Sequence, residues 1–251
     1  MLALIDADVL TYRVGFATQK LVDSELLVEP VHHGYHLIKT NMVKILNGSK
    51  ADTYRLFLTA NDKSNYRFDI AKTKPYKGNR VAPKPVHYQA LRDYMVDHWG
   101  AEVVSGKEAD DAMGIAQMQG QGKTIICGID KDLLMIPGLH YNFVTDTHYK
   151  FEDPGELFVH KKGKILGGGL KFFYAQMLMG DSADNIPGLK GVGPMKALAL
   201  LEKLDTEEEM LYTVRKEYEK QDALSRFNEI ADLLWIQRYE GVPYTDRGIE
   251  L

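Results

Sequence analysis

The sequence of 251 residues contains one cysteine, Cys127, so no disulfide can form within the chain and a reducing, cytosolic compartment is expected. It lacks any apolar run close to the roughly 18 residues of a membrane span, so no membrane segment is expected. The N-terminal stretch 1–10 has no basic residue, and two aspartates interrupt its apolar run. This pattern is unlike a signal peptide, and we expect an intracellular protein.

An excess of positive charge is also missing. The chain has 35 acidic residues against 31 lysines and arginines, a net charge of −4, although nucleic-acid-binding proteins usually carry a basic excess. Its 45% hydrophobic and 26% charged residues are typical of a globular protein. The length suits one large domain, or one domain with a small appendage.

Short apolar runs alternate with helical patterns in the first part of the chain. Strands are predicted at 2–6, 53–59, 101–105 and 123–129, and helices at 31–48, 86–99 and 109–118. This alternation predicts an α/β fold with a parallel sheet covered on both faces. A hairpin is predicted at 148–164, followed only by helices, at about 170–180, 194–204, 206–220 and 222–238. We therefore expect an α/β part over 1–169 and a helical part over 170–251.

Seven acidic residues follow predicted strands or begin a predicted helix, and two more follow the helix predicted at about 170–180. They are Asp6, Asp62, Glu108, Asp110, Asp111, Asp130, Asp132, Asp181 and Asp184. The carboxyl ends of parallel strands share one edge of a sheet, where ligands bind, so the strand-end acids and the helix near Glu108 are expected to meet there. Each acid alone could be an N-cap or turn residue, so the signal lies in their combination.

Crowded carboxylates repel one another unless a cation neutralises them. No histidine or cysteine lies within these motifs, so the ligand set is all oxygen, which suits Mg²⁺ or Mn²⁺ and not zinc. Nine carboxylates exceed the need of one such ion, and two metals can support hydrolysis of a phosphodiester bond. Setting these nine aside leaves 26 acidic against 31 basic residues, a balance that suits a nucleic-acid partner.

A glycine-rich stretch, 186–203, lies between two predicted helices. Gly188, Gly191 and Gly193 would let the backbone approach a partner closely, and Pro194 can begin the next helix. The start of that helix would bind a backbone phosphate without reading bases, with Lys190 and Lys196 beside it. The pattern is that of a helix–hairpin–helix, although it could also be a plain helix connection.

A basic stretch, 64–85, begins just after Asp62. Its basic residues are Arg67, Lys72, Lys74, Lys77, Arg80 and Lys84, interleaved with Tyr66, Phe68 and Tyr76. Such a mixture can hold phosphates and stack on unpaired bases, and Lys77 and Arg80 could stabilise charge on the phosphate that reacts. A solvated basic loop is the alternative.

The ordered motifs LALIDAD, NDKSNYR, PYKGNR, EADDAMG, GIDKDL and GDSADNIPGLKGVGPMKA cover about residues 2–203. Together they resemble the 5′-nuclease (flap endonuclease) family, particularly stand-alone phage 5′–3′ exonucleases and the 5′-nuclease domains of bacterial DNA polymerase I. The resemblance implies a PIN-like core, two divalent metals, and a helix–hairpin–helix over about 180–203 that binds duplex DNA with help from K⁺. It also implies hydrolysis of 5′ ends and flaps that leaves 5′-phosphates.

Carried across by residue, the resemblance divides the nine acids into two metal groups. The first group is Asp6, Asp62, Glu108, Asp110 and Asp111, and the second group is Asp130, Asp132, Asp181 and Asp184. Tyr76, Lys77 and Arg80 match the base of the family's arch or clamp, and Arg67 also matches the family pattern. Because no polymerase domain follows in this chain, a free-standing nuclease for phage replication or repair is expected.

Two alternatives remain open at this stage. A PIN-type ribonuclease would share the core, but the glycine-rich stretch suits a duplex backbone better. A branched-DNA-binding protein without catalysis would gain nothing from so many crowded carboxylates.

Overall fold

The computed structural model describes residues 1–160 and 163–249. The chain divides into two compact units, each built from several segments. The first unit contains 1–63, 82–129 and 139–149, and the second contains 64–81, 130–138 and 150–251. This division differs from the expected boundary after residue 169, because the basic segment and the stretch after the fourth predicted strand both join the helical part.

A six-stranded sheet organises the first unit. In sequence order its strands are β1 (Leu2–Asp6), β4 (Thr53–Thr59), β5 (Glu102–Val104), β6 (Thr124–Cys127), β7 (Gly138–Asn142) and β8 (Thr147–Phe151). Their order across the sheet is β5-β4-β1-β6-β7-β8, and the pairs from β5 to β7 are parallel. The four predicted strands are confirmed. The parallel pairing places the carboxyl ends of β1 and β4 together, with Asp6 opposite Phe57.

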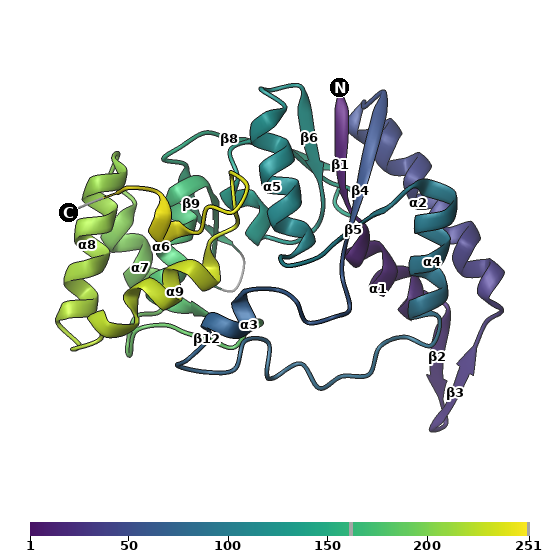
Figure 1. The fold of residues 1–251 in the computed structure, drawn as a ribbon, viewed down its shortest axis with the longest axis horizontal. Helices are drawn as coiled ribbons and strands as arrows, with labels where there is room; N and C mark the ends of the chain where they lie inside the picture. Colours follow the sequence, from purple (N-terminus) through teal and green to yellow (C-terminus); the bar gives the residue numbers. More distant parts are fainter. Residues whose placement is uncertain (161–162, 250–251) are drawn as a thin grey trace. The chain divides into compact units, whose positions relative to one another are not determined.

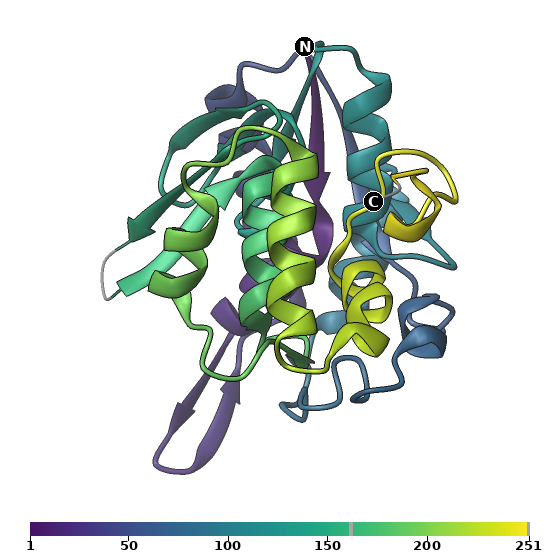
Figure 2. The ribbon, with the colours of Figure 1, turned by 90° about the vertical axis from the view of Figure 1, so that its left-hand side faces the viewer.

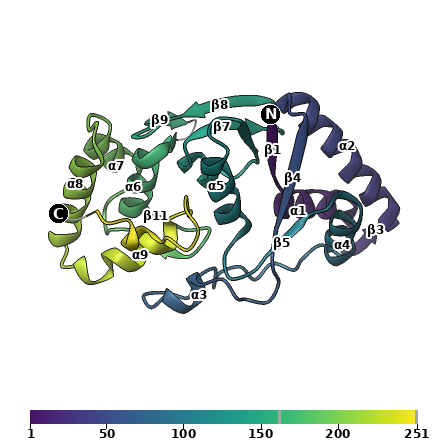
Figure 3. The same ribbon diagram turned by 45° about the horizontal axis from the view of Figure 1, so that its top comes forward.

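Helices cover both faces of this sheet. Helix α5 (Ala109–Gln119) lies on one side of β1 and β4, and α1 (Ala7–Ala17), α2 (Val31–Ser49) and α4 (Tyr88–Trp99) lie on the other (Figures 1 and 3). The sequence did not predict α1, because it begins directly after β1 and its exposed face interrupts the apolar pattern. Between α1 and α2, a hairpin of β2 (Gln19–Val22) and β3 (Glu25–Val28) projects from the helices (Figure 1).

The second unit is mainly helical and has its own core. Its helices are α3 (Arg67–Ile70), α6 (Gly169–Met179), α7 (Pro194–Leu201), α8 (Glu207–Glu219) and α9 (Phe227–Leu234), with short helical turns at Asp132–Met135, Leu224–Arg226 and Tyr244–Asp246. Nearly every residue of α6 is buried, because α7, α8 and α9 all pack against it. Figure 2 shows these helices, coloured green to yellow, grouped together.

One strand pairing and one helix end differ from expectation. β9 (Glu156–His160) pairs with β10 (Lys164–Gly168), so the predicted hairpin over 148–164 is wrong; β8 joins the large sheet instead. Part of that prediction, residues 161–162, lies outside the described residues. Of the helix predicted at 222–238, only α9 is an α-helix, because the chain becomes extended at Trp235. None of the helices in the described ranges is long and apolar enough to cross a membrane.

Candidate metal centre and basic segment

Asp6 lies at the carboxyl end of β1 and is 3% exposed. It is also the N-cap of α1, and its Oδ1 accepts a hydrogen bond of 3.0 Å from the backbone N–H of Val9. The simple N-cap interpretation therefore holds for one of its oxygens. The buried position at a strand end also holds the carboxylate in one orientation, which a metal ligand requires.

The other acids of the first group lie at the neighbouring chain ends of the same unit. Glu108 is the N-cap of α5, and its backbone N–H donates to Asp111 Oδ2 at 3.0 Å in a capping box. Asp110 lies in the first turn of that helix. Asp62, three residues beyond β4, accepts a hydrogen bond of 3.1 Å from Ser105 Oγ. The five acids of the predicted first group all belong to the first unit, at the end of β1, after β4 and at the start of α5.

Two acids of the second group are joined by Lys131, a lysine that the sequence did not mark as functional. Lys131 Nζ lies 2.7 Å from Asp132 Oδ1 and 3.1 Å from Asp181 Oδ2. The Asp130 side chain accepts a hydrogen bond of 2.9 Å from the backbone N–H of Asp132. The ammonium group neutralises a cluster that a divalent cation would otherwise neutralise, so this site attracts positive charge.

Burial and the nearby Asp130 charge raise the pKa of Asp132 to about 7. In Asp181, burial would raise the pKa, but Lys131 and the Ala183 backbone N–H outweigh it and lower the pKa. Gln176, buried on α6, donates a hydrogen bond of 2.5 Å to Asp132 Oδ1. Asp132 therefore occupies a site where a negative charge is costly without an added cation.

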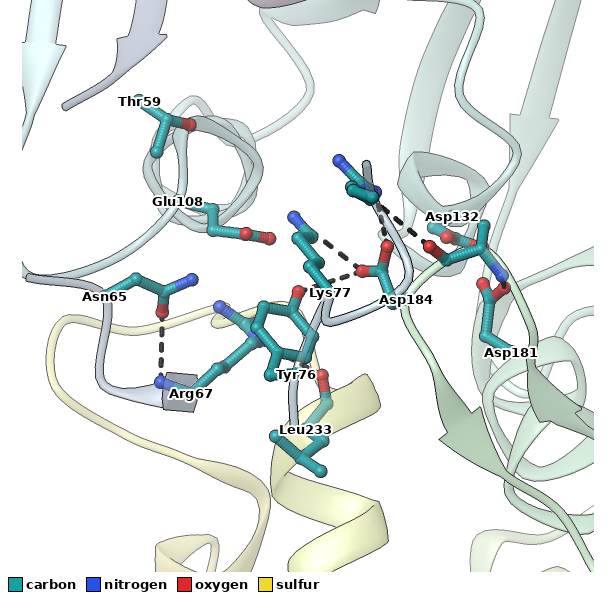
Figure 4. Close-up of polar contacts among 12 residues, drawn as sticks. Thr59, Asn65, Arg67, Tyr76, Lys77, Glu108, Asp132, Asp181, Asp184 and Leu233 are labelled. Carbon is teal, nitrogen blue, oxygen red and sulfur yellow. Dashed lines mark hydrogen bonds and ion pairs between the residues drawn. The ribbon is translucent and has the colours of Figure 1, made fainter. Parts of the chain in front are cut away.

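The fourth acid of this group, Asp184, is held by the basic segment. Tyr76 donates its hydroxyl to Asp184 Oδ2 at 2.9 Å, Lys77 Nζ lies 3.7 Å from the same oxygen, and Arg80 forms an ion pair with Oδ1 (Figure 4). Backbone contacts support this arrangement, since the Lys77 N–H donates to the Asp184 carbonyl at 2.9 Å. The sequence motifs PYKGNR and GDSADN are therefore in direct contact within the second unit.

These residues fit hard divalent cations. All nine predicted ligands are carboxylates, and in the second unit their charge already gathers cationic side chains. In the arrangement described for residues 1–160 and 163–249, no three such side chains converge closely enough to form a metal-binding group. The first group lies in the first unit and the second group in the second, so each group supplies its own set of carboxylates.

Arg67 differs from the expectation of a DNA contact. It is 2% exposed, and its guanidinium donates to the carbonyl of Leu233 at 3.0 Å and to that of Trp235 at 2.5 Å (Figure 4). These carbonyls end α9, whose last turn has no further N–H groups to satisfy them. Arg67 thus anchors the start of the basic segment to α9, and its charge is not presented to a ligand.

Replacing Arg67 with alanine is expected to lower the free energy of unfolding by about 3 kcal/mol, because two buried carbonyls lose charged donors. Urea denaturation would measure the loss, with Arg215→Ala, an exposed arginine on α8, as control. If Arg67→Ala leaves stability unchanged and weakens DNA binding, Arg67 contacts DNA as the sequence predicted.

The glycines of the hairpin divide into two kinds. A Cβ on Gly188 would lie 2.2 Å from the Met179 carbonyl oxygen, so this glycine is required for packing, and the predicted ligand contact does not suit it. Gly191 has φ +70°, and a Cβ on Gly191 or Gly193 would meet no atom within 4 Å. Only these two glycines therefore leave open backbone beside the start of α7, where Gly193 is the N-cap.

The lysines predicted to contact DNA, Lys72, Lys74, Lys190 and Lys196, are exposed. Lys190 presents its side chain while Gln221 binds its backbone N–H and carbonyl at 2.9 and 3.0 Å, and Lys196 lies 3.5 Å from Glu217.

The sequence did not indicate one further residue of the basic segment's surroundings. Glu229 of α9 accepts hydrogen bonds from the backbone N–H groups of Lys72 and Thr73, at 2.8 and 2.6 Å, and so holds the basic segment in place.

Known proteins are similar in sequence to most of this chain. The chain is 27% identical over 220 residues to the 5′–3′ exonuclease of Buchnera aphidicola, covering 85% of this chain and 74% of the relative. It is 30% identical over 222 residues to the thermostable DNA polymerase I of Thermus thermophilus, covering 83% and 24%, and 27% identical over 267 residues to DNA polymerase I of Bacillus subtilis, covering 100% and 28%. It thus spans about a quarter of the polymerases' length. No protein-family model matches the chain.

Solved structures share the fold. The flap endonuclease of bacteriophage T5, in a complex with DNA and metal ions, gives a TM-score of 0.53 at 16% identity, with 93% of both chains covered. A T5 protein co-crystallised with metal ions gives a TM-score of 0.57 at 16% identity, again with 93% of both chains covered. At this level of identity the likeness concerns the backbone arrangement.

Proposed function

We propose that this protein hydrolyses DNA at 5′ ends, flaps and junctions and leaves 5′-phosphates. The chain is related in sequence to a 5′–3′ exonuclease and has the PIN-like fold of the 5′-nucleases. The proposal rests chiefly on the contact of Tyr76, Lys77 and Arg80 with Asp184. This contact supports the proposal because cationic groups that could bind a phosphate lie beside a carboxylate that could bind a metal. We infer an intracellular site of action, where such DNA is found.

The two carboxylate groups would hold one Mg²⁺ or Mn²⁺ each. Such a cation pair, when bound, activates the attacking water and stabilises the leaving oxygen. The chain's own contribution is to orient the ligands: Asp6 through the N-cap of α1, Asp111 through the capping box of α5, and Asp132 through Gln176. These contacts would limit how far the ligands can move.

Lys131 would be displaced from Asp132 and Asp181 as a cation enters, since both compete for the same carboxylate oxygens. Lys77 and Arg80 would turn from Asp184 toward the phosphate whose charge grows during the reaction. Tyr76, 5% exposed, would stay in place and keep this segment against Asp184.

The open hairpin backbone at Gly191 and Gly193 would bind a phosphate of the duplex, with Lys190 and Lys196 beside it and K⁺ completing the site. Lys72 and Lys74 would contact the single-stranded part of the substrate. The hairpin therefore sets the distance between the gripped duplex and the bond that is cut.

Replacing Gly191 with valine is expected to weaken duplex binding roughly 10-fold, because valine disfavours φ +70° and covers the open backbone. Metal binding should stay at the wild-type value. Fluorescence anisotropy with labelled duplex, and Mn²⁺ titration of the same variant, would measure both. A variant that loses metal and duplex together would contradict the separation of the two sites.

Cleavage of a 5′-labelled flap DNA, alongside plain duplex DNA and single-stranded RNA, tests the activity directly. We expect cutting near the DNA junction with Mg²⁺ and none with EDTA. Preference for RNA would favour a PIN-type ribonuclease. DNA binding without any cleavage, by a folded protein with Mg²⁺, would favour a binding protein.

A further inference from the structure

Asp8 lies two residues after Asp6 and resembles a sixth ligand of the first group, but both of its oxygens are already used. Arg92 Nη1 lies 2.7 Å from Asp8 Oδ1, and the backbone N–H of Thr59 donates to Asp8 Oδ2 at 2.8 Å. The Asp8 side chain therefore links the first turn of α1 to the carboxyl end of β4. Its charge is met within the protein by the Arg92 guanidinium.

Arg92 completes this link from a third element. It lies on α4, is 4% exposed, and its Nη2 donates to the Thr59 carbonyl at 2.6 Å. One planar guanidinium thus holds Asp8 with one nitrogen and Thr59 with another. A lysine could keep the charge but could not make both bonds in this geometry.

The same group of contacts extends to the other acids of the first group. Thr59 Oγ1 accepts a hydrogen bond of 2.9 Å from the backbone N–H of Ala109, the residue directly after Glu108 (Figure 4 labels Thr59 and Glu108). The Tyr88 hydroxyl, 3.4 Å from Arg92 Nη1, donates to Asn61 Oδ1 at 3.1 Å. Asn61 directly precedes Asp62. Each chain end that carries a first-group acid is therefore tied to Arg92 or Asp8.

We propose that Asp8 and Arg92 form a positioning clamp that sets the relative placement of Asp6, Asp62 and Glu108. The inference rests on the proposed metal site and adds two residues that do not touch metal or substrate. Groups outside the coordination shell fix the orientation of ligands, and their loss typically weakens metal binding by about 10- to 100-fold. The clamp does this through the backbone, because its bonds end on Thr59 and Ala109.

Two variants of the full chain test the clamp. Asp8→Asn removes the charge that holds Arg92, and Arg92→Lys keeps a charge but removes the fork. Met95→Ala is the control, since Met95 is a buried residue of α4 that none of the clamp's bonds involves. Mn²⁺ binding is measured by electron paramagnetic resonance, and cleavage rates are measured as a function of Mg²⁺ concentration.

Both clamp variants are expected to bind Mn²⁺ roughly 10-fold more weakly and to need about as much more Mg²⁺ for half-maximal cleavage. Saturating Mg²⁺ should restore most of the rate, and Met95→Ala should titrate like the wild type. Wild-type titration curves for both clamp variants would overturn the inference, and so would an equal weakening in Met95→Ala. Loss in Asp8→Asn alone would make Asp8 a direct ligand. A wild-type chain that binds no Mn²⁺ would remove the proposed function itself.

Discussion

Replacing Asp181 with asparagine is expected to reduce DNA cleavage by about 1000-fold while DNA affinity stays within about threefold, because a metal site contributes several kcal/mol to the transition state and little to duplex binding. Asp181 is 7% exposed and faces Lys131, so asparagine changes the charge with little change of shape. Single-turnover cleavage and fluorescence anisotropy with the same flap DNA would measure the two effects.

The control for this change is Asp222→Asn, which alters an exposed aspartate of the same unit. It should leave cleavage and affinity at wild-type values. If Asp181→Asn cleaves as fast as Asp222→Asn, Asp181 belongs to a structural ion pair with Lys131 and not to a metal site. If it instead loses DNA binding, the acid supports the hairpin more than the chemistry.

Replacing Lys77 with alanine is expected to slow the chemical step by about 100-fold and to change DNA affinity only slightly. Lys77 Nζ lies 3.7 Å from Asp184 and the Lys77 side chain is only 20% exposed, which supports the proposed contact with one phosphate rather than with the DNA backbone in general. Single-turnover rates at saturating enzyme separate this effect from binding.

Lys72→Ala provides the contrast, because Lys72 is exposed and its backbone alone is held, by Glu229. Lys72→Ala should weaken binding of single-stranded DNA and reduce the number of ions released on binding, read from its salt dependence, by about one. The rate of the chemical step should not change. The assignment of separate roles would be wrong if the two variants changed rate and affinity in the same proportion.

The sequence predicted the strands that Asp6 and Asp62 follow, for a physical reason. Carboxylates that follow buried parallel strands must lie at one edge of the sheet, and Asp6 and Asp62 do so beside the start of α5. Register and burial of β1 and β4 follow from their apolar runs. A pattern of this kind is local to each strand and can therefore be read without the rest of the fold.

The contacts that the sequence did not predict connect segments far apart in the chain. The pattern around Gln176 predicts only a buried position on an apolar helix, and its contact with Asp132 cannot be read from it. Arg67 looks like a basic loop residue, although its partners lie more than 160 positions away. Lys131 lies within the motif DKD, but the sequence did not predict its contact with Asp181, which depends on the fold. Such roles depend on tertiary packing that no periodicity encodes.

In the proposed reaction each of the two carboxylate groups would hold one divalent cation, and the dependence of the cleavage rate on free Mg²⁺ tests this most directly. With flap DNA under single-turnover conditions, the logarithm of the rate should rise with the logarithm of Mg²⁺ concentration at a slope of about 2 below saturation. Asp130→Ala should be inactive or rise at about 1. A wild-type slope of about 1, unchanged in Asp130→Ala, would contradict the account.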